Sequence, residues 1–262
     1  MYYYISEAPR SRDEQRSLEH VRTLLTNYGI AGEFVTTSPA RTIEELAELG
    51  VAKKYSTIVG VGSDMLINRL ASLLAGTPYV FGALPLTNPR ALELITGVTT
   101  IEEAAEALKY RRIYTVPITR IEPNKFLLTE AVIHLPRPAV ARLEIDGAKI
   151  EATCTDIRIA GNGRVIIEHK DTATSTLGSV WQWMRGHVAT DPAPSHFVGT
   201  HITLELDTTC PAYVGTDIIA KTPLAATVLP GVLKIIAKRG RLTQAQEQTE
   251  PAGRQQYALT NG

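Results

Sequence analysis

Residues 62–69 carry the strongest sign of chemistry in this 262-residue chain. They read Gly-Ser-Asp-Met-Leu-Ile-Asn-Arg and follow a short β-branched run, 57–61, that is typical of a buried parallel strand. Apolar residues recur at helical spacing after Asp64, which indicates a helix with this aspartate as its N-cap. Ligands of open α/β sheets bind where such turns leave the strands, and helix N-termini offer free N–H groups to anions. The turn at 62–65 is therefore the first candidate for a phosphate site.

Two later stretches also place polar residues at turns. Residues 81–88 end a second apolar segment, and their last two members, Thr87 and Asn88, precede Pro89 in a pattern that predicts a helix start. Residues 213–217, Tyr-Val-Gly-Thr-Asp, end on Asp217. Thr-Pro follows at 222–223, and Val-Leu-Pro-Gly-Val-Leu-Lys-Ile follows at 228–235.

In this order the three stretches resemble the motifs of the diacylglycerol and sphingosine kinases, a family of lipid kinases. Residues 62–69 are similar to that family's G-G-D-G-T-x-N-E turn, 81–88 to its G-x-x-P-L-G-T-x-N-D loop, and 213–235 to its V-D-G-E, T-P and v-l-P-G-x-L-k-v endings. The resemblance implies ATP-dependent phosphoryl transfer with Mg²⁺, in which Asp64 and Asp217 are the candidate catalytic acids. It assigns the nucleotide contacts to Gly62, Ser63, Asn68, Thr87 and Asn88. We assign no metal ligand.

The matched motifs depart from the family's pattern where phosphate binding depends on them. Glycine lets the backbone approach a phosphate closely, yet Ser63 and Met65 stand where the family has glycines. Pro89 and Gly215 each replace an aspartate, and the loop at 6–11 has an acid but no glycine. The sequence thus predicts a divergent lipid kinase-like protein with weak or lost phosphoryl transfer.

Other interpretations stay open at this point. A plain helix N-cap explains Asp64 better than a catalytic role does, and a solvated turn aspartate explains Asp217 at least as well. The protein could be a non-catalytic binding or scaffold protein on the kinase frame. It could also be a kinase of a small soluble alcohol, because the helical excursion that the family usually has after its counterpart of residue 126 is missing, which puts a lipid pocket in doubt.

The elements around these motifs predict two domains. Short strands alternate with amphipathic helices up to residue 110, and this pattern predicts a three-layer parallel α/β domain at 1–110, with helix caps at Thr42 and Thr100. Short alternating strands separated by Asp-Gly, Asn-Gly and proline turns then predict an antiparallel β-sandwich domain at 111–240. One helix is expected at 179–184, and 241–262 reads as a loosely held polar tail. The resemblance implies the same order, with nucleotide in the cleft between the domains.

Composition limits the partners. Lysine plus arginine and aspartate plus glutamate both number 27, so a nucleic-acid partner is not expected. The chain lacks a signal-peptide pattern and a long apolar run, which predicts a cytoplasmic protein with at most peripheral membrane contact. A lipid or another small molecule is the expected substrate, and a homo-oligomer is compatible with the sequence. Cys154 and Cys210 are expected to be buried thiols, and the histidines form no ligand spacing and no legible Ser/His/Asp grouping.

Overall fold

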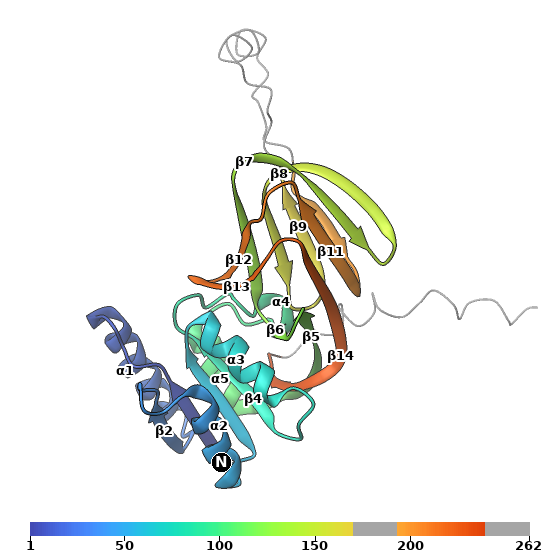
Figure 1. Cartoon of the computed structure of the whole chain (residues 1–262). Helices are drawn as coiled ribbons and strands as arrows, with labels where there is room; N and C mark the ends of the chain where they lie inside the picture. The colour runs from blue at the N-terminus through green and yellow to red at the C-terminus, as the bar shows by residue number, and fades with distance from the viewer. Residues whose placement is uncertain (170–192, 239–262) are drawn as a thin grey trace, which may run out of the picture.

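The computed structural model describes residues 1–169 and 193–238. The expected helix at 179–184, His187 and the expected tail at 241–262 lie outside these residues. Figure 1 shows the helices gathered in one part of the molecule. The other part contains the long strands β7 (Glu130–Ile145) and β8 (Ala148–Ala160) and the shorter strands β9 (Arg164–Glu168) and β11 (His201–Leu206).

The N-terminal part is a parallel sheet with helices on both faces. Its strands lie in the order β4-β3-β1-β2, and every neighbouring pair is parallel. The strands and helices of this part are β1 (Tyr2–Ser6), α1 (Arg12–Asn27), β2 (Gly32–Thr36), α2 (Ile43–Ala52), β3 (Thr57–Gly62), α3 (Asp64–Leu74), β4 (Val80–Pro85), α4 (Glu93–Thr96) and α5 (Ile101–Tyr110).

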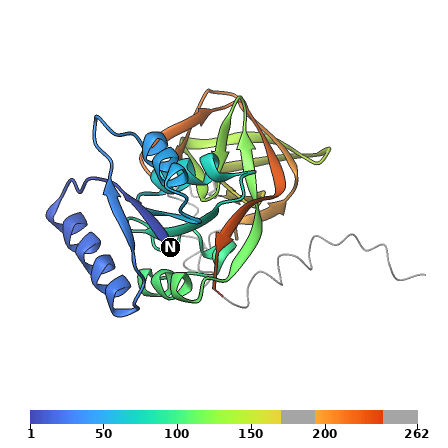
Figure 2. The ribbon, with the colours of Figure 1, turned by 90° about the horizontal axis from the view of Figure 1, so that it is seen from below.

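Alternating side chains of the strands make two separate cores. Tyr3 and Ile58 pack with α2 and α3, whereas Tyr4 and Val59 pack with α1 and α5. Figure 2 shows the two pairs of helices on opposite sides of the strands. Successive residues of a strand point to opposite faces, so both faces of this sheet are buried and the predicted three layers are confirmed.

The predicted helix caps are also present. The Thr42 side chain and Glu45 form a reciprocal capping box at the start of α2, and the Thr100 hydroxyl accepts the Glu103 backbone N–H at the start of α5.

The C-terminal part is rich in antiparallel strands that enclose a third core, to which Ile133, Leu143, Ile157 and Leu204 belong. Strands cover most of 130–168, as the alternating pattern predicts. The fold class is therefore an α/β part followed by a β-rich part. The strands are β5 (Ile113–Ile121), β6 (Lys125–Leu127), β7 (Glu130–Ile145), β8 (Ala148–Ala160), β9 (Arg164–Glu168), β10 (Ser195–Val198), β11 (His201–Leu206), β12 (Pro211–Val214), β13 (Asp217–Lys221) and β14 (Leu224–Ile236).

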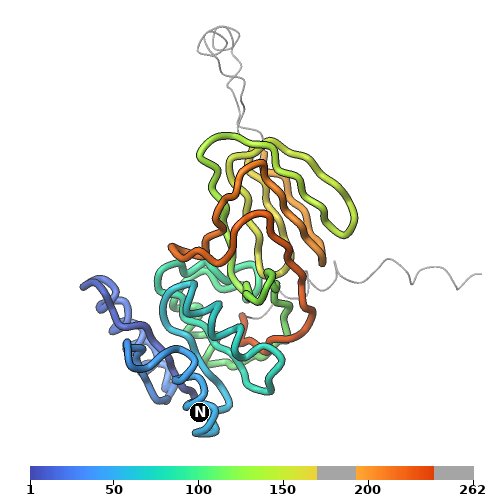
Figure 3. The backbone as a smooth tube through the Cα atoms, viewed as in Figure 1, coloured from blue at the N-terminus to red at the C-terminus, as the bar shows by residue number. Residues whose placement is uncertain are grey.

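Strand β14 connects the two parts. Its first half pairs with β11, and its end pairs in parallel with β4, where Lys234 lies opposite Val80 and Ile235 opposite Phe81. One sheet therefore runs along the path β10-β9-β8-β7-β11-β14-β4-β3-β1-β2. The tube in Figure 3 traces this last strand from the β-rich part back to the α/β part. The limits predicted for the domains, 1–110 and 111–240, stay predictions.

Proline-containing segments run inside two of the long strands. The pairing register shifts between His134 and Ala139 in β7 and between Leu229 and Leu233 in β14, where the prolines lie. Bulges tolerate proline because the bulged residue needs no ladder hydrogen bond. Cys154 and Cys210 are both buried and free, as predicted.

Candidate functional site

The turn between β3 and α3 contains a single linking residue, Ser63. Its backbone is extended, with φ −73° and ψ 163°, and its Oγ accepts the backbone N–H of Leu66 at 3.3 Å. Ser63 is therefore the N-cap, and the prediction that Asp64 caps this helix is wrong. Asp64 is the first residue of α3, because the extended backbone that an N-cap requires occurs one residue earlier.

The carboxylate of Glu7 fills this turn. Glu7 lies in the loop after β1, and its side chain reaches the turn. Its Oε2 accepts the Ser63 backbone N–H at 2.8 Å, and its Oε1 accepts the Ser63 hydroxyl at 2.7 Å. Both donors of the N-cap residue are thus used inside the chain. The sequence displays an acid in this loop, but only the pairing of β1 with β3 brings it to the turn.

Asp64 is buried beside that turn, with its side chain close to Asn88. It is 8% exposed, and its Oδ1 has no hydrogen-bond partner within the described residues. Burial raises the pKa of the Asp64 carboxyl, and a hydrogen bond with the Asn88 side chain opposes that rise. The structure therefore joins these two predicted site residues. Asn88 and its neighbour Thr87 are exposed.

The loop that carries Thr87 and Asn88 does not start a helix where the sequence predicts one. A turn forms instead, in which the Ala91 backbone N–H donates to the Asn88 carbonyl at 2.9 Å, and α4 begins only at Glu93. A helix start with proline at its first position is therefore a wrong prediction here. Thr87 and Asn88 have bend and coil conformations that end β4.

Asn68 lies one turn further along α3 and binds the β6–β7 connection. Its amide nitrogen donates to the Asp64 carbonyl at 2.8 Å and to Thr129 Oγ1 at 2.6 Å. Its amide oxygen accepts the backbone N–H groups of Leu128 at 2.6 Å and Thr129 at 3.0 Å. The side chain has two donor hydrogens and two acceptor lone pairs, so its hydrogen-bonding capacity is used within the chain.

An acidic cluster that sequence reasoning missed lies near Asp64. Burial raises the pKa of Glu130 at the start of β7; the Arg158 guanidinium opposes this rise, and the carboxylates of Glu168 and Asp64 add to it. Arg158 Nη2 is 2.6 Å from Glu168 Oε1, and its Nε is 3.8 Å from Glu130 Oε1. The side chains come from β7, β8 and β9, which are distant from α3 in sequence, so no local pattern marks them as a group.

Asp217 lies elsewhere, at the start of β13. It pairs with Val214 across a hairpin whose turn contains Gly215 in a left-handed conformation, φ +59°. The Asp217 side chain is exposed and makes no hydrogen bond or ion pair with the part of the chain that the structure describes. Asp217 and Asp64 are therefore not joined by any contact.

The structure pairs a histidine with a serine that the sequence does not connect. His169 Nε2 is 2.7 Å from Ser195 Oγ, and its Nδ1 is 3.1 Å from the Thr153 carbonyl oxygen. In the Ser-His-Asp triad a carboxylate accepts the proton on that second ring nitrogen and stabilises the imidazolium, whereas here a backbone carbonyl takes its place. His134 Nδ1 contacts Asp156 Oδ1 at 2.5 Å on the neighbouring strand.

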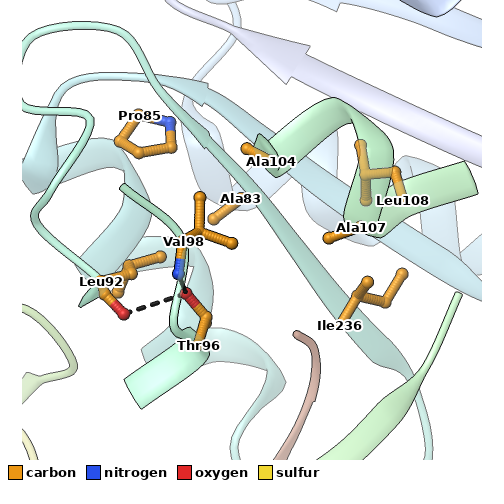
Figure 4. A pocket seen from close by; sticks show the side chains of 9 residues that line it. All are labelled: Ala83, Pro85, Leu92, Thr96, Val98, Ala104, Ala107, Leu108 and Ile236. Atoms are coloured by element: carbon orange, nitrogen blue, oxygen red, sulfur yellow. Dashed lines mark hydrogen bonds between the residues drawn. The ribbon is translucent and has the colours of Figure 1, made fainter. Parts of the chain in front are cut away.

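A small pocket lies between β4 and α5 (Figure 4). Thr96 is its single polar lining side chain, and the Thr96 hydroxyl is already used because it donates to the Leu92 carbonyl at 2.9 Å. The remaining lining is apolar, and the space holds about one water molecule. It is a packing gap rather than a nucleotide site.

ATP and Mg²⁺ are the cofactors that the resemblance implies, and the β3–α3 turn as it stands does not fit the phosphates of ATP. Glu7 already occupies the donors that a phosphate oxygen needs, and Asp64 and Glu130 add negative charge nearby. No three His, Cys, Asp or Glu side chains among residues 1–169 and 193–238 are grouped to hold a metal ion.

Comparisons with known proteins bear on the fold. No family model and no curated protein matches the sequence. A solved structure described as a diacylglycerol kinase from Bacillus anthracis matches with a TM-score of 0.61 and 14% identity, over 91% of this chain and 97% of that chain. A second structure from that organism, assigned provisionally to the same activity, gives a TM-score of 0.64 and 13% identity over the same shares.

These matches confirm the predicted resemblance at the level of the fold. The chain has a diacylglycerol kinase-like fold, in which an α/β part precedes a β-rich part. Within the described residues, no helix is long and apolar enough to cross a membrane.

Proposed function

We propose that this chain is a diacylglycerol kinase-like protein whose ATP-dependent phosphoryl transfer is weak or lost. One observation carries the proposal: a single residue, Ser63, links β3 to α3. Phosphoryl transfer depends on backbone donors that surround the phosphates. A one-residue link supplies only the two donors of Ser63, which Glu7 already binds, and Met65 is inside the helix.

The fate of the other predicted site residues supports the same conclusion. Asn68 is fully hydrogen-bonded within the chain, and Asp217 is exposed on a separate hairpin. Removing one well-placed stabilising donor typically lowers an enzyme's rate by about a hundred- to thousandfold. Several such defects together leave little activity. It follows that the protein uses the kinase-like fold in a non-catalytic binding or scaffold role.

A kinase of a small soluble alcohol is the second candidate. The observation that favours it is β7, which runs as a strand from Glu130 to Ile145 with a bulge in place of a helical excursion. Without that excursion the chain has less material to surround an acyl tail. In this case ATP and Mg²⁺ would be the cofactors, and Asp64 and Asp217 the candidate catalytic acids.

The test combines binding with turnover. We expect ATP with Mg²⁺ to produce no thermal shift and no calorimetric heat. We also expect no labelled product when radiolabelled ATP is offered with diacylglycerol, sphingosine or short-chain alcohols. Asp64→Asn and Asp217→Asn serve as controls, with a bacterial diacylglycerol kinase as the positive control. Robust turnover that either substitution abolishes would contradict the proposal, and the acceptor used would then decide between a lipid and a soluble alcohol.

A further inference from the structure

We propose that Ser195 is a nucleophilic serine, that His169 is its general base, and that this serine takes an acyl group from small activated esters. The site shares no residue with the β3–α3 turn or with the kinase-like motifs, so it goes beyond the proposed function. Two hydrogen bonds of one imidazole ring, directly after β9, carry the inference.

The two contacts of His169 fix the position of its ring proton. Its Nδ1 lies 3.1 Å from the Thr153 carbonyl oxygen. A carbonyl oxygen only accepts hydrogen bonds, so Nδ1 carries the proton of the neutral imidazole. Nε2 then has a free lone pair, and it lies 2.7 Å from Ser195 Oγ. The serine hydroxyl therefore donates to the ring, which is the arrangement of a nucleophile and its general base.

Strand pairing brings these groups together. Ser195 lies opposite Ile167 in the antiparallel pair of β9 and β10, and His169 follows Ile167 by two residues. The Thr153 carbonyl belongs to β8, the neighbour of β9 on its other side. The hydroxyl, the imidazole and the carbonyl thus come from three adjoining strands or their ends, so the paired backbones position the base against the nucleophile.

The surroundings of the serine combine access with apolar side chains. Ser195 and His169 are both partly exposed, so a small molecule in solution can reach them. Alternate residues of a strand share a face, which places Phe197 beside Ser195. Phe197 packs against the core of the β-rich part, to which Ile167 belongs. An apolar acyl group therefore suits this position better than a charged one.

The reaction is acyl transfer to the serine. Ser195 Oγ attacks the ester carbonyl carbon while His169 Nε2 takes the hydroxyl proton. The bond from that carbon to the leaving oxygen then breaks, and the imidazolium gives the proton to the leaving alkoxide. The products are an acyl-serine and an alcohol.

The carbonyl at Nδ1 limits the range of esters. It holds the imidazole tautomer as the carboxylate of a Ser-His-Asp triad does, but it carries no full charge to stabilise the imidazolium. We therefore expect acylation by esters with good leaving groups and not by ordinary alkyl esters.

The experiment uses an alkyl fluorophosphonate and p-nitrophenyl acetate as probes. The first forms a phosphonyl-serine with loss of fluoride, which peptide mass spectrometry locates. The second releases p-nitrophenolate as the serine is acylated. Wild type is compared with Ser195→Ala and with His169→Gln, because glutamine fills similar space without a basic nitrogen. His196→Gln is the matched control, since His196 is exposed and its side chain points to the opposite face of β10.

The exposed Ser38 is the internal reference for labelling, because its hydroxyl contacts no imidazole in the part of the chain that the structure describes. A positioned general base typically contributes about a hundred- to ten-thousandfold. We therefore expect wild-type Ser195 to be labelled about a hundredfold faster than Ser38, or more. His169→Gln should remove this difference, and His196→Gln should keep it. Release of p-nitrophenolate should fall in Ser195→Ala and His169→Gln alike.

Thermal unfolding checks that each variant is folded, and His169→Asn provides a second variant if His169→Gln is unstable. Equal labelling of Ser195 and Ser38 in wild type would overturn the inference, as would undiminished labelling of Ser195 in a folded His169 variant. Either result would leave the pair as a structural link between β9 and β10. The kinase assay tests the proposed function separately and affects neither result.

Discussion

Two carboxylates beside one turn have opposite environments. Glu7 has a hydrogen bond on each oxygen, whereas Asp64 is buried with one oxygen unpartnered among the described residues. A buried polar group without a partner costs about 1–3 kcal/mol. Asp64 gains some compensation from its place in the first turn of α3, where a negative charge is favourable by about 0.3–1 kcal/mol at exposed sites. The burial penalty is the larger of the two, and it agrees with the raised pKa.

We therefore expect Asp64→Asn to stabilise the fold at neutral pH by about 1 kcal/mol, or about 2–4 °C in Tm. The folded-state pKa of Asp64 is raised, so protonation favours the folded state. The stability of wild type falls as pH rises from the unfolded pKa of about 4 through the folded pKa. The advantage of the asparagine variant should therefore vanish in acid and grow with pH.

Thermal unfolding from pH 3 to 8 checks this expectation. Asp13→Asn is the control, because the Asp13 side chain is 90% exposed. A variant that is less stable than wild type at pH 8 would show that Asp64 has a stabilising charge partner.

Helix α3 is held by polar contacts as well as by its apolar face. Glu7 binds its N-terminus, and Asn68 connects its second turn to the segment between β6 and β7. The Asn68 contacts join the α/β part to the β-rich part beside the acidic cluster. The same side chain that the family resemblance assigns to nucleotide therefore has a structural use here.

We expect Asn68→Ala to lower the free energy of unfolding by about 2–4 kcal/mol. The substitution leaves the buried N–H groups of Leu128 and Thr129 without an acceptor, and each such loss costs about 1–3 kcal/mol. Urea unfolding measures the change. Asn124→Ala, in the exposed β5–β6 turn, is the control and should change stability by less than about 0.5 kcal/mol. Equal stability of the two variants would contradict this role for Asn68.

At the scale of the whole molecule, the balance of charge in the sequence predicts weak membrane binding. The chain has 27 basic and 27 acidic residues. Helix α1 mixes its arginines with acids in the first turn, and no described helix could cross a membrane. A basic segment gains about 1 kcal/mol per lysine or arginine near an anionic surface, and mixed charges cancel much of that gain.

We therefore expect weak binding to vesicles of phosphatidylcholine and phosphatidylglycerol at about 0.15 M salt, where charges are screened beyond about 8 Å. Co-sedimentation measures it, with pure phosphatidylcholine vesicles as the control. Most of the protein should remain in the supernatant with both. Strong sedimentation with the anionic vesicles alone would reveal a basic surface assembled in three dimensions.

The sequence by itself predicted the alternation of strands and helices in the N-terminal part and the strand-rich part that follows it. Strand Thr57–Gly62, the caps at Thr42 and Thr100 and the alternating strands after residue 111 depend on local periodicity and local hydrogen bonds, so a short window is enough to predict them. The motif order also pointed to the fold that the solved structures share.

Only the tertiary structure decided what surrounds the candidate site. Glu7 reaches Ser63 because β1 pairs with β3, and Glu130 approaches Asp64 because β7 begins beside α3. The two pairs are 56 and about 66 residues apart in sequence. Their physical reason is strand pairing between distant segments, which leaves no periodic trace in the sequence. The sequence predicts Asp64 as the N-cap of α3, whereas the structure has Ser63 there. Both residue types cap helices well, so the backbone conformation at the end of β3 decides which of them is the cap.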